Sequence, residues 1–230
     1  MSPIHALIKN VLVIYLNNFK YFLGLLGIAL IWNLALAVIP VDLATSLRLL
    51  WPIAIASLII SLFTELALIK GFAAIAANQQ APIGKILLSA LVKLPWFIML
   101  SLIWSVIVFT GLVLFIIPGI AFANWLIFFP VLYIIENQKG LRIFKASKLL
   151  VDRAFFPILV RAAAIIFISI VLAKLASRGF EFISLTIIPD QYLSARTSIQ
   201  YSASGIISSL IQPLIPGTLV LLYYEIRKMI

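Results

Sequence analysis

Apolar positions along this chain occur in long runs that short polar stretches separate. The run from Trp96 to Ile117 contains no charged residue. A helix needs about 20 such residues to cross the hydrocarbon core of a bilayer. The pattern therefore predicts an all-α polytopic integral membrane protein with a single membrane domain over residues 1–230. The six predicted transmembrane helices are residues 21–39, 52–77, 94–117, 120–135, 155–176 and 199–224.

Two proline-containing stretches modify this simple succession of spans. Ile117-Pro118-Gly119-Ile120 leaves almost no loop between the third and fourth spans, so a tight helical hairpin is expected there. Gln212-Pro213 and Pro216-Gly217 lie within the sixth span and predict a broken helix. Broken helices occur at transport sites, whereas small residues with proline also produce close packing and a kink. Both interpretations of the sixth span remain open from the sequence.

Three further segments, residues 3–19, 82–93 and 139–153, are predicted as amphipathic interfacial helices on the cytoplasmic face. In residues 82–93 the apolar positions recur at helical spacing, beginning with Ile83 and Ile86. The two later segments follow similar text, Asn78-Gln79 and Asn137-Gln138. Span, polar turn, interfacial helix and span thus occur twice, which predicts a parallel internal repeat.

The segment 139–153 has the clearest two-sided pattern. Its apolar face includes Ile143 and Phe144, and its basic face carries Arg142, Lys145 and Lys148. A basic amphipathic helix of this kind is typical of contact with an anionic leaflet, so these three residues are the candidate lipid-headgroup contacts. The alternative is an ordinary basic surface helix that contributes only to topology.

Charge supports the same arrangement. The chain has 17 Lys and Arg against 7 Asp and Glu, a formal net charge of +10. With six spans, most basic residues fall on one side, and only four fall opposite: Arg48, Lys174, Arg178 and Arg196. The positive-inside rule then places both termini in the cytoplasm, at a cytoplasmic (inner) membrane. The basic balance is an orientation signal rather than a sign of nucleic-acid binding.

Few residues of the chain belong to the types that perform chemistry. There is no cysteine and one histidine, His5, which excludes thiol chemistry and most zinc arrangements. No Gly-x-Ser-x-Gly, phosphate-binding glycine loop or close pair of carboxylates occurs. The sequence therefore predicts a protein that is not an enzyme and that has no metal and no cofactor.

Glu65 is the most informative single residue, because it falls near the middle of the second span. An ionised side chain there costs about 3 kcal/mol, so such a residue is expected to face protein or water. It is either a proton- or cation-responsive site or a hydrogen-bonded carboxyl that joins helices. Possible partners are Lys70, Arg161 and Gln212. Asn124 adds an intramembrane amide of the kind that commonly joins helices.

Short motifs in the second half of the chain resemble a known family. They are Phe-Ile-Ile-Pro-Gly-Ile from Phe115, Phe129-Pro130-Val131, Glu136-Asn137, Lys145-Ala146-Ser147-Lys148-Leu149 and Leu222-Tyr223-Tyr224-Glu225-Ile226-Arg227. In order, they resemble the uncharacterised YciC-type inner-membrane proteins and the related membrane domain of some glycerophosphodiester phosphodiesterases. The resemblance implies a six-span inner-membrane fold and no activity, because the phosphodiesterase barrel is a separate domain. Family-like positions with turn, capping or interface roles are Pro118, Gly119, Glu136, Ser147 and Arg227.

These observations together predict a non-catalytic membrane protein in lipid handling or membrane organisation. Its expected partners are membrane lipids, anionic ones in particular. The alternative is a transporter or channel for a small solute or lipid, centred on Glu65 and Gln212. The two differ in that transport requires a polar path between the faces of the membrane. The sequence names no protein partner and no oligomeric state.

Overall fold

The computed structural model describes the chain except residues 1–2, 39–46, 80, 139, 188–192 and 230. Residue 39, where the first predicted span ends, and residue 139, where the predicted segment 139–153 begins, therefore lie outside the described part. Its described elements are all helices. They are α1 (Ile4–Asn17), α2 (Phe19–Val38), α4 (Leu47–Ala76), α5 (Ile83–Leu114), α6 (Ile116–Trp125), α7 (Phe129–Ile135), α8 (Arg142–Asp152), α9 (Phe155–Ile187), α10 (Leu193–Ile211) and α11 (Leu214–Arg227).

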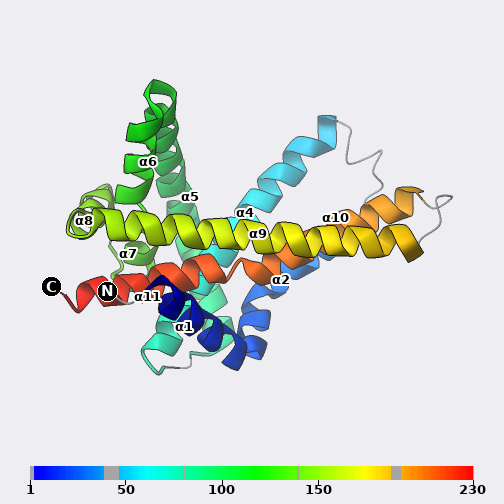
Figure 1. Cartoon of the computed structure of the whole chain (residues 1–230), viewed down its shortest axis with the longest axis horizontal. Coiled ribbons are helices and arrows are strands. Elements are labelled where there is room, and N and C mark those ends of the chain that lie inside the picture. The colour runs from blue at the N-terminus through cyan, green and yellow to red at the C-terminus, as the bar shows by residue number, and fades with distance from the viewer. Residues whose placement is uncertain (1–2, 39–46, 80, 139, 188–192, 230) are drawn as a thin grey trace.

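Six stretches of these helices are long and apolar enough to cross a membrane. They are Phe19–Leu36, Leu50–Ala76, Ile83–Leu114, Ile116–Ile135, Phe155–Thr186 and Thr197–Arg227. This confirms the predicted all-α, multi-span architecture. Both termini and α8 lie at one end of the molecule, whereas the α5–α6 hairpin projects away from the long α9 (Figure 1).

The third predicted span and the interfacial segment before it are one helix, which corrects the prediction of a separate helix at residues 82–93. α5 runs without interruption from Ile83 to Leu114 and contains Pro95. Its buried positions Ile86, Ala90 and Leu94 continue at the same spacing into Phe97. Because one packed face passes through the boundary, no turn forms there. At about 1.5 Å per residue this helix is longer than the hydrocarbon core is thick.

The hairpin between the third and fourth spans is as tight as the sequence predicts, but its turn comes earlier. Phe115 alone separates α5 from α6 and has an extended backbone. Pro118 lies in the first turn of α6, where a missing N–H is tolerated. Gly111 and Gly119 let the two helices touch, since a Cβ on Gly111 would lie 2.9 Å from the Gly119 Cα. Gly119 therefore serves close packing rather than the turn.

The fourth span is not one helix, which differs from the uninterrupted span predicted for residues 120–135. α6 ends at Trp125 and α7 begins at Phe129. The buried Ser147 of α8 connects the two ends: its hydroxyl donates to the Trp125 carbonyl oxygen at 2.8 Å and accepts from the Phe128 N–H at 3.2 Å. One side chain thus satisfies a donor and an acceptor that the break exposes.

The basic segment forms α8, and its apolar face packs on the protein. Ile143, Phe144 and Val151 are buried, against α6, α7 and α9. Neighbouring helices therefore cover the apolar face and leave the basic side of α8 uncovered. In α1, Leu7 and Val11 are likewise buried, mostly against α11, whereas its exposed side carries both polar and apolar residues, such as Lys9 and Leu16.

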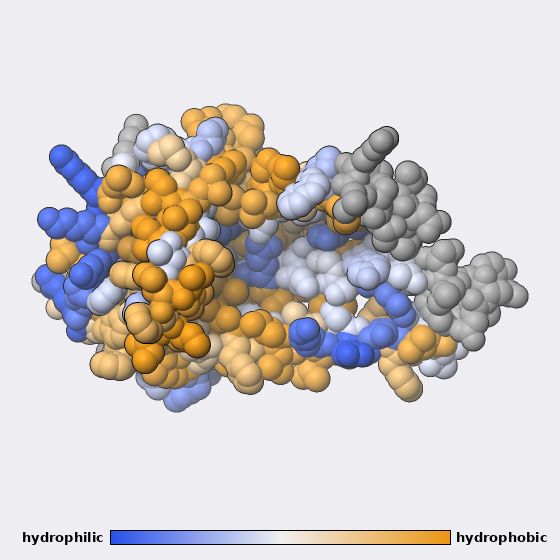
Figure 2. All heavy atoms as spheres, turned by 90° about the horizontal axis from the view of Figure 1, so that it is seen from above, coloured by the Kyte–Doolittle hydropathy of each residue, from blue (hydrophilic) through white to orange (hydrophobic). Residues whose placement is uncertain are grey.

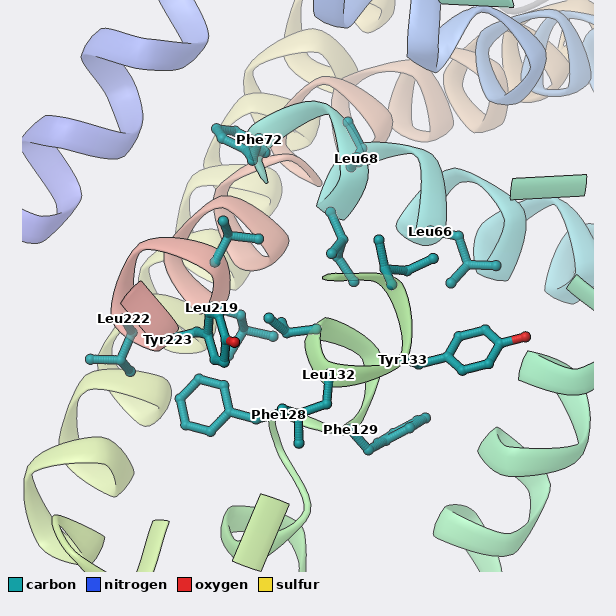
Figure 3. Packing of buried hydrophobic residues seen from close by; sticks show 14 of the residues in the cluster. Leu66, Leu68, Phe72, Phe128, Phe129, Leu132, Tyr133, Leu219, Leu222 and Tyr223 are labelled. Atoms are coloured by element: carbon teal, nitrogen blue, oxygen red, sulfur yellow. The ribbon is translucent and has the colours of Figure 1, made fainter. Parts of the chain in front are cut away.

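The main core lies where α4, α7 and α11 meet (Figure 3). Leu66 of α4, Leu132 of α7 and Leu219 of α11 belong to this one cluster of buried residues. The exposed residues of the α5–α6 hairpin are largely apolar, in keeping with a lipid-facing surface. Seen from above, apolar residues cover this part, and hydrophilic residues lie in a recess beside it (Figure 2).

The two polar turns that suggested an internal repeat share a backbone feature. Asn78, after α4, has φ of 54°, and Asn137, after α7, has φ of 52°. Asparagine tolerates this left-handed conformation better than most residues, which suits it to end a helix. The following segments differ, because α5 continues as a span whereas α8 ends at Asp152.

Candidate functional site

The sixth span is broken in the middle, where the sequence predicts a break. α10 ends at Ile211 and α11 begins at Leu214, so Gln212 and Pro213 separate them. Pro213 has no N–H and cannot continue the hydrogen-bond ladder. The Tyr15 hydroxyl of α1 donates to the Leu210 carbonyl oxygen at 3.1 Å, which satisfies one acceptor near the break. The first helix of the chain thus forms a hydrogen bond with the backbone beside this break.

A cavity of about 590 Å³ lies among α4, α5, α6 and α9, with parts of α7 and α11 in its wall. Its lining is almost entirely apolar, with side chains such as Leu62, Ile98 and Ile166. Among the described residues that line it, Glu65 is the one titratable group, and its side chain is partly exposed. The volume falls in the range of about 300–1,000 Å³ that is typical of small-molecule sites.

Glu65 has no hydrogen-bond or ion-pair partner in the described part of the chain. Lys70, one expected partner, instead donates from its Nζ to the Ser89 hydroxyl at 2.5 Å. Arg161 lines neither cavity described here and donates to the Pro157 carbonyl oxygen of its own helix at 3.4 Å. The Glu65 carboxylate therefore faces an apolar cavity without an ion pair among these residues.

Further polar atoms without partners border the same cavity. Asn124 is 3% exposed, and its Nδ2 donates to the Phe155 carbonyl oxygen at 3.1 Å, while its Oδ1 has no partner among the described residues. The same is true of the Ser101 Oγ and the Trp104 Nε1. Buried polar groups are normally hydrogen-bonded, and a membrane interior supplies few substitutes. The cavity thus offers donors and acceptors within an apolar wall.

A second cavity, of about 460 Å³, lies among α2, α4, α9 and α10. Its lining is rich in hydroxyl and amide side chains and includes Gln212. The Trp32 Nε1 donates to the Ser57 hydroxyl at 2.9 Å, and the Asn33 Nδ2 donates to the Ser209 hydroxyl at 3.1 Å. We call it the polar cavity and the first one the apolar cavity.

The structure brings two of the predicted intramembrane residues together and separates a third. Glu65 and Asn124 line the apolar cavity, whereas Gln212 lines the polar cavity. Ile215, in the first turn of α11, lines both and forms part of the wall between them. The sequence does not single out Ser57 and Ser169 of the polar cavity or Trp104 of the apolar cavity, because isolated serines and tryptophans are ordinary in spans. Only the packing of several helices brings these side chains to the two cavities.

Glu136 and Arg227, two of the residues that the sequence motifs singled out, meet at the ends of α7 and α11. Tyr223 donates to the Glu136 Oε1 at 2.5 Å, Gln138 donates to the Oε2 at 2.6 Å, and Arg227 forms an ion pair with the same carboxylate. Burial opposes ionisation of Glu136, but the hydrogen bonds from Tyr223 and Arg227 outweigh it and hold the pKa of this carboxyl below its ordinary value. The cluster ties the last helix to the middle of the chain.

The three candidate headgroup residues lie on the uncovered side of α8. Arg142, Lys145 and Lys148 are exposed. The Lys148 Nζ lies 4.7 Å from the centre of the Trp125 ring, a cation–π contact. This contact holds one positive charge beside the α6–α7 break. The described residues contain no cluster of three or more His, Asp or Glu that could hold a metal ion.

Comparisons with known proteins returned nothing: no family model, no curated protein and no solved structure matches this chain.

Proposed function

We propose that this multi-span membrane protein binds a membrane amphiphile in the apolar cavity and acts without catalysis in lipid handling. The observation that carries the proposal is the Glu65 carboxylate facing an apolar cavity without a partner among the described residues. A hydrocarbon chain fits the apolar lining, and a head that donates hydrogen bonds or carries positive charge supplies the missing partner.

The absence of a second titratable group from the described lining of this cavity supports a non-catalytic role. General acid–base catalysis by carboxylates commonly uses a pair of groups, and Glu65 is alone there. The Asn124 Oδ1 and the Trp104 Nε1 can orient a ligand by hydrogen bonds but cannot transfer a proton to it.

Native mass spectrometry of the protein released from lipid nanodiscs tests this proposal. Ala163→Trp fills the apolar cavity from its wall, so we expect it to reduce the retained lipid strongly. Ala176→Trp is the matched control, because Ala176 is an exposed residue of the same helix outside both cavities. Equal retention by the two variants would contradict binding in this cavity.

A carboxylate exchange tests the head-group contact separately. Glu65→Gln should weaken binding of an amphiphile with an amine head about tenfold, because a charge-assisted hydrogen bond is replaced by a neutral one. Glu181→Gln makes the same chemical change in an exposed side chain that pairs with Arg178. If both variants bind an amine-headed probe as the unaltered protein does, Glu65 makes no head-group contact.

A second candidate function is transport of a small solute or lipid between the membrane faces. Two adjoining cavities with a shared wall at Ile215, beside a broken helix, favour it. Flux of a fluorescent lipid analogue across proteoliposome membranes tests it. Ile215→Trp should block the boundary between the cavities and reduce flux, whereas Ile170→Trp adds the same bulk elsewhere in the polar cavity. No flux above protein-free liposomes would exclude this candidate.

We further propose that the protein lies in a cytoplasmic membrane with both termini in the cytoplasm. The common location of both termini and the basic α8 at one end supports this orientation (Figure 1). Since the chain has no cysteine, single introduced cysteines report topology without background. An impermeant maleimide should label Arg178→Cys from outside intact cells and Lys145→Cys only after permeabilisation. The reverse labelling pattern would show that the orientation is opposite to the proposed one. We also propose that the chain is related to the YciC-type inner-membrane proteins, which its sequence motifs resemble.

A further inference from the structure

The described residues that line the polar cavity include no charged side chain, although several of them can form hydrogen bonds. Six of its polar residues are Asn33, Ser57, Ser61, Ser169, Ser208 and Gln212. A bare ion in such a place would lack a countercharge, which is costly inside a membrane. The chemistry of the lining therefore favours an uncharged ligand that forms several hydrogen bonds.

Ser169 of α9 is the group that most clearly lacks a partner. It is 6% exposed, it lines the polar cavity, and its hydroxyl has no hydrogen-bond partner among the described residues. Two threonines of the spans bond to their own helix: Thr64 donates to the Ile60 carbonyl oxygen at 2.8 Å and Thr218 to that of Leu214 at 2.7 Å. Ser169 does not use this common solution.

Other groups around the polar cavity can form further hydrogen bonds. The Ser57 and Ser209 hydroxyls accept hydrogen bonds from Trp32 and Asn33, and each hydroxyl can still donate one. The Gln212 side chain has no hydrogen-bond partner in the described part of the chain. These groups both donate and accept, and a ligand hydroxyl matches them because it also does both.

We propose that the polar cavity binds an uncharged group with several hydroxyls, such as the glycerol or sugar head of a neutral lipid, or a free polyol. Its volume of about 460 Å³ accommodates such a group with accompanying water. The site is separate from the apolar cavity, so it does not depend on the function proposed above.

Photo-crosslinking in nanodiscs tests this site. The probe is a monoacylglycerol with a diazirine next to its head, and mass spectrometry locates the labelled peptides. We expect labels on α2, α9 and α10, and Ser169→Ala should reduce them about fivefold, the value of one hydrogen bond. Ser101→Ala is the matched control, because its buried hydroxyl also lacks a described partner but lines the apolar cavity.

The two sources of the ligand are distinguished by competition. Protection from labelling by free glycerol supports a site that a polyol alone can fill, whereas protection only by unlabelled monoacylglycerol supports a site for a lipid head. Thermal unfolding without probe should be unchanged in Ser169→Ala, since the hydroxyl has no described partner to lose. Equal labelling of Ser169→Ala and the unaltered protein would overturn the proposal. So would equal labelling by a monoacylglycerol phosphate, because that head is charged.

Discussion

The Tyr15 hydroxyl donates a hydrogen bond to the Leu210 carbonyl oxygen at 3.1 Å and so connects the first helix of the chain to the break in the last span. Tyr15 is otherwise buried, with its ring 5.4 Å from that of Phe22. The ring packs in the core while the hydroxyl donates to a carbonyl oxygen in the last turn of α10, just before the break. The break is thus a built part of the fold.

Removal of this hydroxyl should destabilise the protein without disturbing its packing. Tyr15→Phe leaves the Leu210 carbonyl oxygen without its donor, so we expect a loss of about 1 kcal/mol in unfolding free energy. Reversible unfolding in mixed micelles measures it. Tyr201→Phe, at an exposed ring, is the control and should change little. Equal stability of the two variants would show that the bond contributes nothing.

The Glu136 cluster should make stability sensitive to acid. The pKa of Glu136 in the folded protein lies below its ordinary value of 4.5, so this group stabilises the fold above that pH. The stabilisation is lost as the pH falls through the lowered pKa. Glu136→Gln should therefore be less stable at pH 7 and lose less stability on acidification. Melting temperatures between pH 7 and pH 3 measure this effect.

Glu181→Gln is the control for the acid response, because Glu181 pairs with Arg178 three residues earlier in an exposed position. Surface pairs of this kind contribute about 0–1 kcal/mol. An acid response of Glu136→Gln that matches the unaltered protein would mean that other carboxyl groups determine it.

The α5–α6 hairpin should not tolerate a methyl group at its glycine contact. In Gly119→Ala the new Cβ would lie 2.6 Å from the Leu112 backbone nitrogen, so the helices must separate. Overpacking of this kind costs about 1–3 kcal/mol. Gly84→Ala, in the same hairpin's first helix, meets nothing within 4 Å and should be neutral or stabilising. Thermal unfolding of both variants decides whether the contact is as close as described.

The basic side of α8 should select anionic lipid. Replacement of Arg142, Lys145 and Lys148 by Gln removes three positive charges, each worth about 1 kcal/mol near an anionic surface. We expect the variant to retain less phosphatidylglycerol, relative to phosphatidylcholine, in native mass spectra from mixed nanodiscs. Lys174→Gln with Arg178→Gln, in the second half of α9, is the control. An unchanged lipid ratio in the triple variant would leave α8 as an ordinary surface helix.

The apolar pattern was sufficient to predict the six spans, and the positions of the prolines were sufficient to predict the tight hairpin after the third and the break near Gln212 and Pro213. These features depend on local causes: the length that lipid demands, and the N–H that proline lacks. The spacing of apolar residues such as Ile143 and Phe144 also predicted the apolar face of α8. The sequence did not say that this face meets protein instead of lipid, because both environments are apolar.

Tertiary structure alone decided the partners of the polar side chains. Lys70 was an expected partner of Glu65, yet it bonds to Ser89, and Glu65 faces the apolar cavity with Asn124. Ser147 of α8 forms hydrogen bonds with the Trp125 carbonyl oxygen and the Phe128 N–H at the α6–α7 break. Span length and helix breaks follow from neighbours in sequence, so a sequence determines them directly. A cavity requires several distant helices to meet at particular angles, and side-chain packing across all of them sets those angles.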